Sequence, residues 1–100
     1  MTTPPNIDSL LHAFSEPIRC RIVELLVTEK AALVPTYVAT MLSVKLPVAS
    51  RHLNELYNAK VVHRLPSGRN VLYSINPESL RDLMRYFSNL ESDHNHANPK

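Results

Sequence analysis

Four prolines along the chain, Pro17, Pro35, Pro47 and Pro77, each open a segment in which apolar residues recur at helical spacing. Proline is accepted in the first turn of a helix, because its ring holds φ near the helical value and its missing N–H would have no partner there. The pattern therefore predicts four helices that begin close to these prolines. A mainly helical fold is the first expectation for the 100 residues.

Apolar spacing sets the extent of these helices and adds one more. The segment before Pro17 also has helical spacing, with Asn6 as a candidate cap. The three central helices are expected at about residues 16–28, 35–42 and 46–58, and the last begins near residue 77. The apolar face of the first helix consists of Ile7, Leu10, Leu11 and Phe14. The apolar face of the last helix consists of Leu80, Leu83, Met84, Phe87 and Leu90.

The apolar period changes after the fourth helix. The short runs VVHRL and VLYSI are rich in β-branched residues, and PSGRN lies between them. Gly68, the only glycine of the chain, stands in this connection, where a hairpin turn requires a positive φ. We therefore expect an antiparallel β-hairpin with its tip at PSGRN.

The order of the elements predicts a winged helix-turn-helix, mainly α with a small β-hairpin wing. Residues 43–45 form a short turn between the third and fourth helices, and the basic hairpin that follows would be the wing. The helix at 46–58 would be the recognition helix, which enters the major groove of DNA with its N-terminal residues nearest the bases. Residues 7–91 would form this one domain, between a flexible N-terminus (1–6) and a polar C-terminal tail (92–100).

The distribution of charge supports a nucleic-acid partner. Residues 43–76 hold five basic residues and one acidic residue, whereas the rest of the chain holds six basic and eight acidic residues. A basic middle section between neutral or acidic ends is typical of a surface that binds nucleic acid.

The composition also disfavours several classes of protein. One glycine cannot form a glycine-rich phosphate loop, and no paired-carboxylate or Ser/His/Asp spacing stands out, so we expect no enzyme. No apolar run reaches the ~18 residues of a membrane span. The N-terminus MTTPPNID does not have the pattern of a secretory signal. A single cysteine, Cys20, excludes an internal disulfide framework and fits a cytoplasmic protein.

Three stretches of the chain resemble the ArsR/SmtB (arsenical-resistance-repressor) family of bacterial transcription factors: LHAFSEPIRCRIVELL, VATMLSVKLPVASRHLNELYNAKVV and SGRNVLYSIN. The resemblance covers about residues 7–90. It implies a homodimeric repressor that binds operator DNA and is released by an inducer, often a metal ion. A second hypothesis is a winged-helix adaptor that contacts proteins and does not bind DNA sequence-specifically.

The resemblance and the basic residues together indicate which side chains would contact double-stranded DNA. Relatives commonly have Ser-Gln-Pro-Thr at the start of the recognition helix, where this chain has KLPV at residues 45–48. Leu46 would pack the turn, and Val48 would either do the same or touch a thymine methyl group. Arg51 or His52, on an exposed face, would read base edges. The residues expected at the DNA interface are Lys45, Val48, Ser50, Arg51, His52, Asn54, Arg64 and Arg69.

The apolar faces of the first and last helices predict a dimer. The winged core uses the three middle helices and the hairpin, which leaves these two faces with little to pack against, and a large exposed apolar surface usually marks an interface. Pairing both helices about a two-fold axis would bury the faces and set two recognition helices about one DNA turn apart, roughly 34 Å. The alternative is that both faces pack onto their own protomer.

The metal sites that the resemblance implies lack most of their ligands here. One site needs cysteines at the start of the third helix, and residues 33–42 contain none. The other has its ligand positions at Pro77, Ser79, Leu90 and Asp93, of which only Asp93 could bind a metal. A remaining hypothesis is a zinc or nickel site shared between the tail and the first helix of a second protomer. Its candidate ligands are His12, Asp93, His94 and His96.

Cys20 is expected to be a buried, inert side chain rather than a redox switch. A switch needs an exposed thiol of low pKa and usually a second cysteine, and this chain has one cysteine only. The sequence identifies neither the inducer nor the operator.

Overall fold

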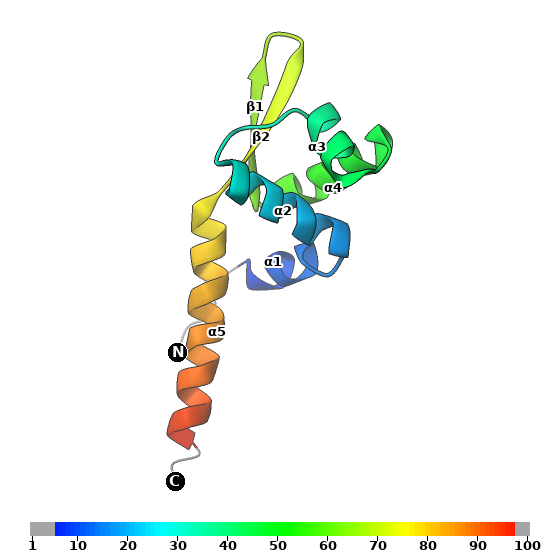
Figure 1. The fold of residues 1–100 in the computed structure, drawn as a ribbon. Helices are drawn as coiled ribbons and strands as arrows, with labels where there is room; N and C mark the ends of the chain where they lie inside the picture. Colours follow the sequence, from blue (N-terminus) through cyan, green and yellow to red (C-terminus); the bar gives the residue numbers. More distant parts are fainter. Residues whose placement is uncertain (1–5, 98–100) are drawn as a thin grey trace.

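The structure is a computed structural model that describes residues 6–97, with side chains for residues 6–92. Within that range the chain forms five helices and one β-hairpin (Figure 1). The bounds are α1 Ile7–Ala13, α2 Pro17–Glu29, α3 Pro35–Leu42, α4 Leu46–Asn58, β1 Val62–Ser67, β2 Asn70–Ile75 and α5 Pro77–Ala97. This order confirms the predicted winged helix-turn-helix.

Local signals place most helix ends where the sequence predicts them. Proline stands in the first turn of α2, α3 and α4 and is the first residue of α5. Helices α3 and α4 have the predicted bounds, and α2 begins and ends one residue later. Asn6 occupies the N-cap position of α1, but its side chain makes no capping hydrogen bond.

Helix α5 is longer than predicted. It continues through Ala97, into the segment that the sequence predicts as a polar tail. No proline or glycine occurs between Pro77 and Pro99, so no residue in this stretch interrupts the helix. Residues 1–5 and 98–100, which the predicted flexible ends include, lie outside the described range.

The core lies where α1 to α4 meet the base of the hairpin. Its fully buried side chains include Leu10, Ile22, Leu26, Leu53 and Leu56. Removing each such side chain from water stabilises the fold by about 1.5–3 kcal/mol. The four-residue spacing of Ile22 and Leu26 and the three-residue spacing of Leu53 and Leu56 thus fix which sides of α2 and α4 face inward.

The hairpin turns at Gly68 and Arg69, because Ser67 and Asn70 are the last paired residues. Gly68 has φ +60°, and glycine is favoured at such a position in a two-residue hairpin turn. At the other end, the backbone N–H and C=O of Leu33 exchange two hydrogen bonds of 2.8 Å with Tyr73. The connection between α2 and α3 is thereby joined to β2, which anchors the wing to the helical core.

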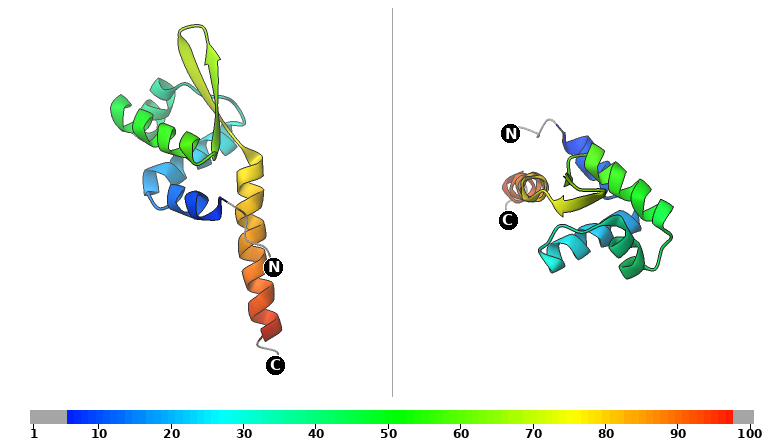
Figure 2. Two further views of the ribbon diagram at one scale, coloured as in Figure 1. Left: turned by 180° about the vertical axis from the view of Figure 1, so that it is seen from behind. Right: turned by 90° about the horizontal axis from the view of Figure 1, so that it is seen from above.

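Helix α5 projects from the winged core as a long rod, with α1 beside it (Figure 2). The molecule therefore measures 56 × 24 × 21 Å. Helix α1 packs onto its own protomer through Ile7 and Leu10, which are buried. The prediction that these two residues form a free dimer face is wrong, because α1 turns its apolar side toward the core of its own chain.

None of the helices within residues 6–97 combines the length and the apolar character that a membrane crossing needs.

Candidate nucleic-acid interface

The turn between α3 and α4 is formed by its own backbone. Ser43 adopts the left-handed conformation, with φ 56°, and closes α3. The next N–H, that of Val44, bonds to the Ala39 carbonyl at 3.0 Å, a pattern that ends many helices. Lys45 is then extended, and α4 begins at Leu46 with Pro47 in its first turn. This geometry fixes the direction of the recognition helix relative to α3.

One side of α4 presents exposed polar side chains next to the start of the helix. Ser50, Arg51 and Asn54 lie there, and Lys45 precedes them at the N-cap. Ala49, Leu53 and Leu56 lie on the opposite, buried side. Leu46 is exposed rather than packed in the turn, which contradicts that expectation, and Val48 is half-buried.

His52 does not lie on this exposed side. It is only 2% exposed, so its predicted contact with base edges is wrong for this structure. Residues three and four apart share one side of a helix, and His52 stands three residues after Ala49 and four before Leu56. The imidazole is therefore turned into the protein together with these two apolar residues.

Arg19 of α2 is the partner of the buried imidazole. Arg19 Nη1 lies 3.2 Å from His52 Nδ1, and since a guanidinium only donates, Nδ1 is the acceptor. Arg19 Nε also donates to the Ala13 carbonyl at 2.8 Å, and Nη2 to the His12 carbonyl at 3.4 Å. Burial lowers the pKa of His52 below its usual 6.5, and the positive charges of Arg51 and Arg19 lower this pKa further.

Arg64 joins the wing to the recognition helix. From β1, its Nη2 donates to Asn54 Oδ1 at 2.7 Å, and its Nε donates to the Tyr73 hydroxyl at 3.2 Å. The guanidinium carbon also lies 3.9 Å from the centroid of the Tyr57 ring. Arg64 and Asn54, both predicted DNA contacts, are thus bonded to each other across α4 and β1.

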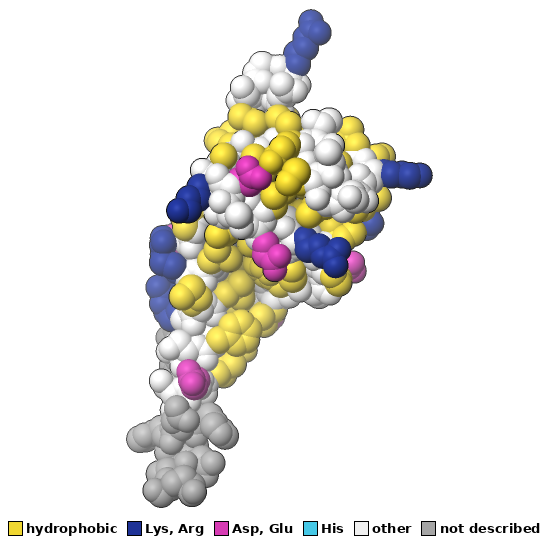
Figure 3. All heavy atoms as spheres, in the orientation of Figure 1, with side chains coloured by type: hydrophobic (Ala, Val, Ile, Leu, Met, Phe, Trp, Pro, Cys, Tyr) yellow, Lys and Arg dark blue, Asp and Glu magenta, His cyan; other side chains and the backbone are white. Residues whose placement is uncertain are grey.

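Arg69 is the basic residue of the hairpin tip, and it is exposed. A cationic side chain projects from the end of the hairpin in Figure 3, well beyond the helical core. Of the predicted DNA contacts, Lys45, Ser50, Arg51 and Arg69 are exposed and without side-chain partners among the described residues.

Helix α5 presents an exposed apolar face outside the winged core. Met84, Phe87 and Leu90 are 68%, 53% and 46% exposed. Met84 and Phe87 line a groove of about 560 Å³ together with the half-buried Leu83 and with Phe14 of α1. Figure 3 shows hydrophobic side chains gathered along this part of the molecule.

Comparison with known proteins places this geometry among transcriptional regulators. No family model matches the chain, and no curated protein matches its sequence. A solved structure described as a possible transcriptional regulator for arsenical resistance is 26% identical, with 92% of this chain and 97% of that chain covered and a TM-score of 0.73. The homodimeric winged helix-turn-helix DNA-binding domain of Mb0332 from Mycobacterium bovis, a possible ArsR-family regulator, is 21% identical, with 89% and 81% covered and a TM-score of 0.70.

The transcriptional repressor PagR of Bacillus anthracis is more similar in sequence. It is 32% identical, with 71% of this chain and 79% of that chain covered and a TM-score of 0.64. The chain belongs to the ArsR family of winged helix-turn-helix transcriptional regulators. The family resemblance predicted from the sequence is thereby confirmed.

The ArsR-family metal positions can now be placed in the fold. Pro77 and Ser79 stand in the first turn of α5, where Ser79 is buried and donates to the Asn76 carbonyl at 2.7 Å. The described residues contain no group of three His, Cys, Asp or Glu side chains that could share a metal ion. His12 is exposed on α1, whereas the side chains of Asp93, His94 and His96 lie outside the described part of the chain.

Cys20 of this ArsR-family protein is half-buried on α2. Its thiol donates to the Phe14 carbonyl at 3.4 Å.

Proposed function

We propose that the protein is a homodimeric repressor that binds operator DNA and is released from it by an inducer. The observation that carries the proposal is the row of exposed polar and basic side chains at the start of α4, beside a wing with an exposed arginine at its tip. Lys45, Ser50 and Arg51 in this row have no side-chain partner within the part of the chain that the structure describes. Its similarity to the repressor PagR supports the direction of regulation.

The proposed DNA contacts divide between bases and phosphates. Ser50 and Arg51 lie in the first two turns of α4, the part of a recognition helix that approaches base edges. Lys45 and Arg69 would neutralise phosphates at the two ends of the interface. Val48 is half-buried, and its exposed part is available to a thymine methyl group.

The proposed dimer uses α5. Its exposed apolar face would be buried against the same face of a second chain, as expected for a two-fold interface. Phe14 of α1 lines the same groove, while Leu80 and Leu83 connect the face to the core. Leu11 is an exposed apolar residue of α1 and completes the proposed interface. The homodimeric state of the M. bovis domain supports a dimer of this chain, and the exposed face of α5 is our proposal for its interface.

DNA binding over a range of salt concentrations tests the proposal. A DNA site is first selected from a random duplex library, and its affinity for the purified protein is then measured by fluorescence anisotropy. We expect log Kd to rise steeply with log salt concentration, because each neutralised phosphate releases counterions. A slope near zero would favour the protein-binding adaptor instead.

Equilibrium dialysis tests the zinc or nickel hypothesis separately. The full chain is compared with a chain that ends at residue 91, and each is dialysed against zinc and against nickel. Binding that does not depend on residues 92–100 would refute the tail site.

A further inference from the structure

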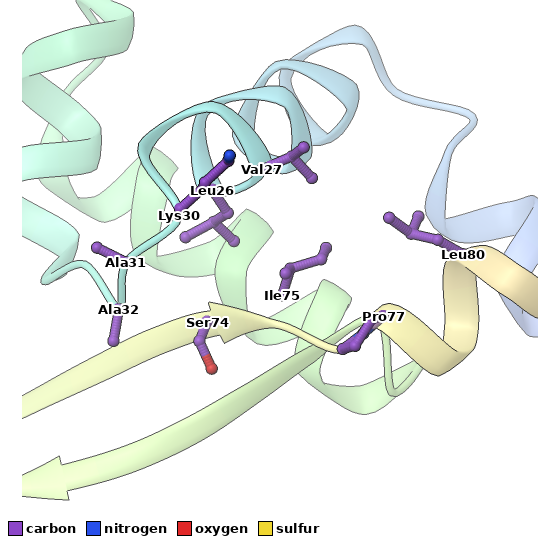
Figure 4. Close-up of a pocket in the computed structure, with 9 residues that line it drawn as sticks. All are labelled: Leu26, Val27, Lys30, Ala31, Ala32, Ser74, Ile75, Pro77 and Leu80. Atoms are coloured by element: carbon purple, nitrogen blue, oxygen red, sulfur yellow. The ribbon is translucent and has the colours of Figure 1, made fainter.

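A cavity lies where α2, β2 and α5 meet, away from the proposed DNA contacts. Its volume is about 510 Å³, within the range of roughly 300–1,000 Å³ that small-molecule sites occupy. Leu26 and Val27 of α2 form one wall, Ile75 the floor and Leu80 of α5 the far end (Figure 4). The cavity is therefore bounded by three elements that are distant in the sequence.

The walls are mostly aliphatic, and their polar residues are Ser74 and one cation. Lys30, the C-cap residue of α2, and Ala31 follow Val27 on this side, and both line the cavity. The carboxylate of the neighbouring Glu29 accepts a 2.7 Å hydrogen bond from the Tyr37 hydroxyl, on the side of α3. Lys30 forms no ion pair with any carboxylate whose side chain the structure describes. An apolar molecule with one anionic end would match this lining.

The cavity also adjoins the place where α5 leaves the winged core. At this junction the Asn76 side chain donates to the Lys60 carbonyl at 2.9 Å and accepts from the Glu78 N–H at 3.2 Å. Ile75, one residue before the junction, ends β2, and Leu80 lies in the second turn of α5. A molecule that fills the cavity therefore touches both the base of the wing and the start of α5.

We propose that this cavity binds an amphiphilic carboxylate of the medium-chain fatty-acid type, with its alkyl chain against Leu26, Ile75 and Leu80 and its carboxylate at Lys30. The bound molecule would alter the angle between α5 and the winged core, and with it the spacing of the two recognition helices. This regulatory role rests on the proposed function, because it makes the carboxylate the inducer. Binding of the carboxylate in the cavity does not depend on the proposed function.

Calorimetry with decanoate tests the site in the absence of DNA. The concentrations stay below the point at which decanoate aggregates, and decanol serves as the uncharged ligand of equal chain length. We expect one decanoate per chain. Lys30→Met should weaken decanoate binding about tenfold, the effect of losing one charge-assisted hydrogen bond, and leave decanol binding unchanged.

A second variant fills the cavity from its rim. Ala31→Phe should abolish binding of both ligands, whereas Thr28→Phe, an exposed position on α2 that does not line the cavity, should bind them like the original protein. Thermal unfolding shows that each variant is folded. The site would be overturned if the original protein did not bind decanoate. It would also be overturned if Ala31→Phe bound decanoate as tightly as the original protein, because decanoate would then bind to another surface, such as the exposed face of α5.

The regulatory role is measured on the selected DNA site. Saturating decanoate should weaken DNA binding at least about fivefold, the lower end of typical allosteric couplings, and should have no effect on Ala31→Phe. Unchanged DNA affinity with decanoate bound would overturn the regulatory role and leave the site intact. If the protein does not bind DNA in the absence of decanoate, the proposed function itself is refuted.

Discussion

The guanidinium of Arg19 donates to the buried imidazole of His52 and, at the same time, to the carbonyls that end α1. Arg19 is only 6% exposed, and its partners come from two other helices. A single side chain of α2 thus connects α1 to the recognition helix. Since Nδ1 of His52 must accept, this arrangement requires an unprotonated nitrogen there.

Stability should fall when His52 has to take up a proton. Because its pKa is lowered in the folded protein, the unfolded chain binds more protons between the two pKa values, so the free energy of unfolding decreases as pH falls below 6.5. Above pH 6.5 the unprotonated His52 makes its full contribution to the free energy of unfolding. Glu16 and Glu55, whose charges raise this pKa, oppose the shift without reversing it. Urea unfolding between pH 8 and pH 5.5 measures the effect.

Two substitutions isolate the contribution of His52. His52→Asn keeps an acceptor oxygen near the position of Nδ1 and cannot be protonated, so its unfolding should depend less on pH. His63→Asn makes the same exchange at an exposed histidine of β1 and is the control for the substitution itself. If His52→Asn has the same pH dependence as the original protein, the imidazole does not control it.

The sequence predicts the helices well because their signals are local. Pro35 and Pro47 begin α3 and α4 within their own first turns, and apolar spacing identifies the buried sides. Gly68 likewise fixes the hairpin turn by its own conformation. Each of these features depends on residues that are neighbours in the chain.

The side-chain contacts could not be predicted in the same way. The polarity of His52 predicts a position on the surface, whereas its partner Arg19 is 33 residues away in the sequence. The spacing of His52 from Ala49 and Leu56 was the one available signal of burial. The positive charge of Arg64 predicts a DNA contact, and only the packing of β1 on α4 brings its side chain to Asn54. The inward packing of Leu10 also depends on the tertiary fold.

Arg51→Ala should weaken binding to the selected DNA site by about 1–3 kcal/mol and relax its sequence preference. Arg51 is exposed on the polar side of α4 and has no side-chain partner in the described residues, so its loss should not disturb the fold. Affinities for the site and for single-base variants measure both effects. Unchanged affinity together with unchanged preference would show that α4 does not read bases through Arg51.

Arg69→Ala should weaken binding to all DNA sequences by a similar factor. The residue lies at the tip of the wing, and a phosphate contact carries no sequence information. The slope of log Kd against log salt concentration should decrease by about 1. A loss confined to one sequence would instead indicate that Arg69 reads a base.

Arg64 should act by holding the wing rather than by its charge alone. Arg64→Lys retains the charge but cannot donate to Asn54 and Tyr73 in the same fork, so we expect it to lose about 1 kcal/mol of stability and to bind DNA more weakly. Arg64→Met should behave similarly. Urea unfolding and DNA affinity are measured for both variants. Full DNA affinity in Arg64→Lys, with a loss only in Arg64→Met, would identify Arg64 as a simple phosphate contact.

Phe87→Glu should convert the proposed dimer into monomers. Phe87 is 53% exposed in a single protomer, so the carboxylate stays in water there, whereas a two-fold contact through α5 would bury it without a partner. We expect the dimer dissociation constant to rise more than about 100-fold, as measured by sedimentation velocity. Asn89→Glu is the matched control, because it adds the same charge about 200° away around the helix. If both variants remain dimeric, the chains associate through another surface, and if both dissociate, the effect comes from net charge.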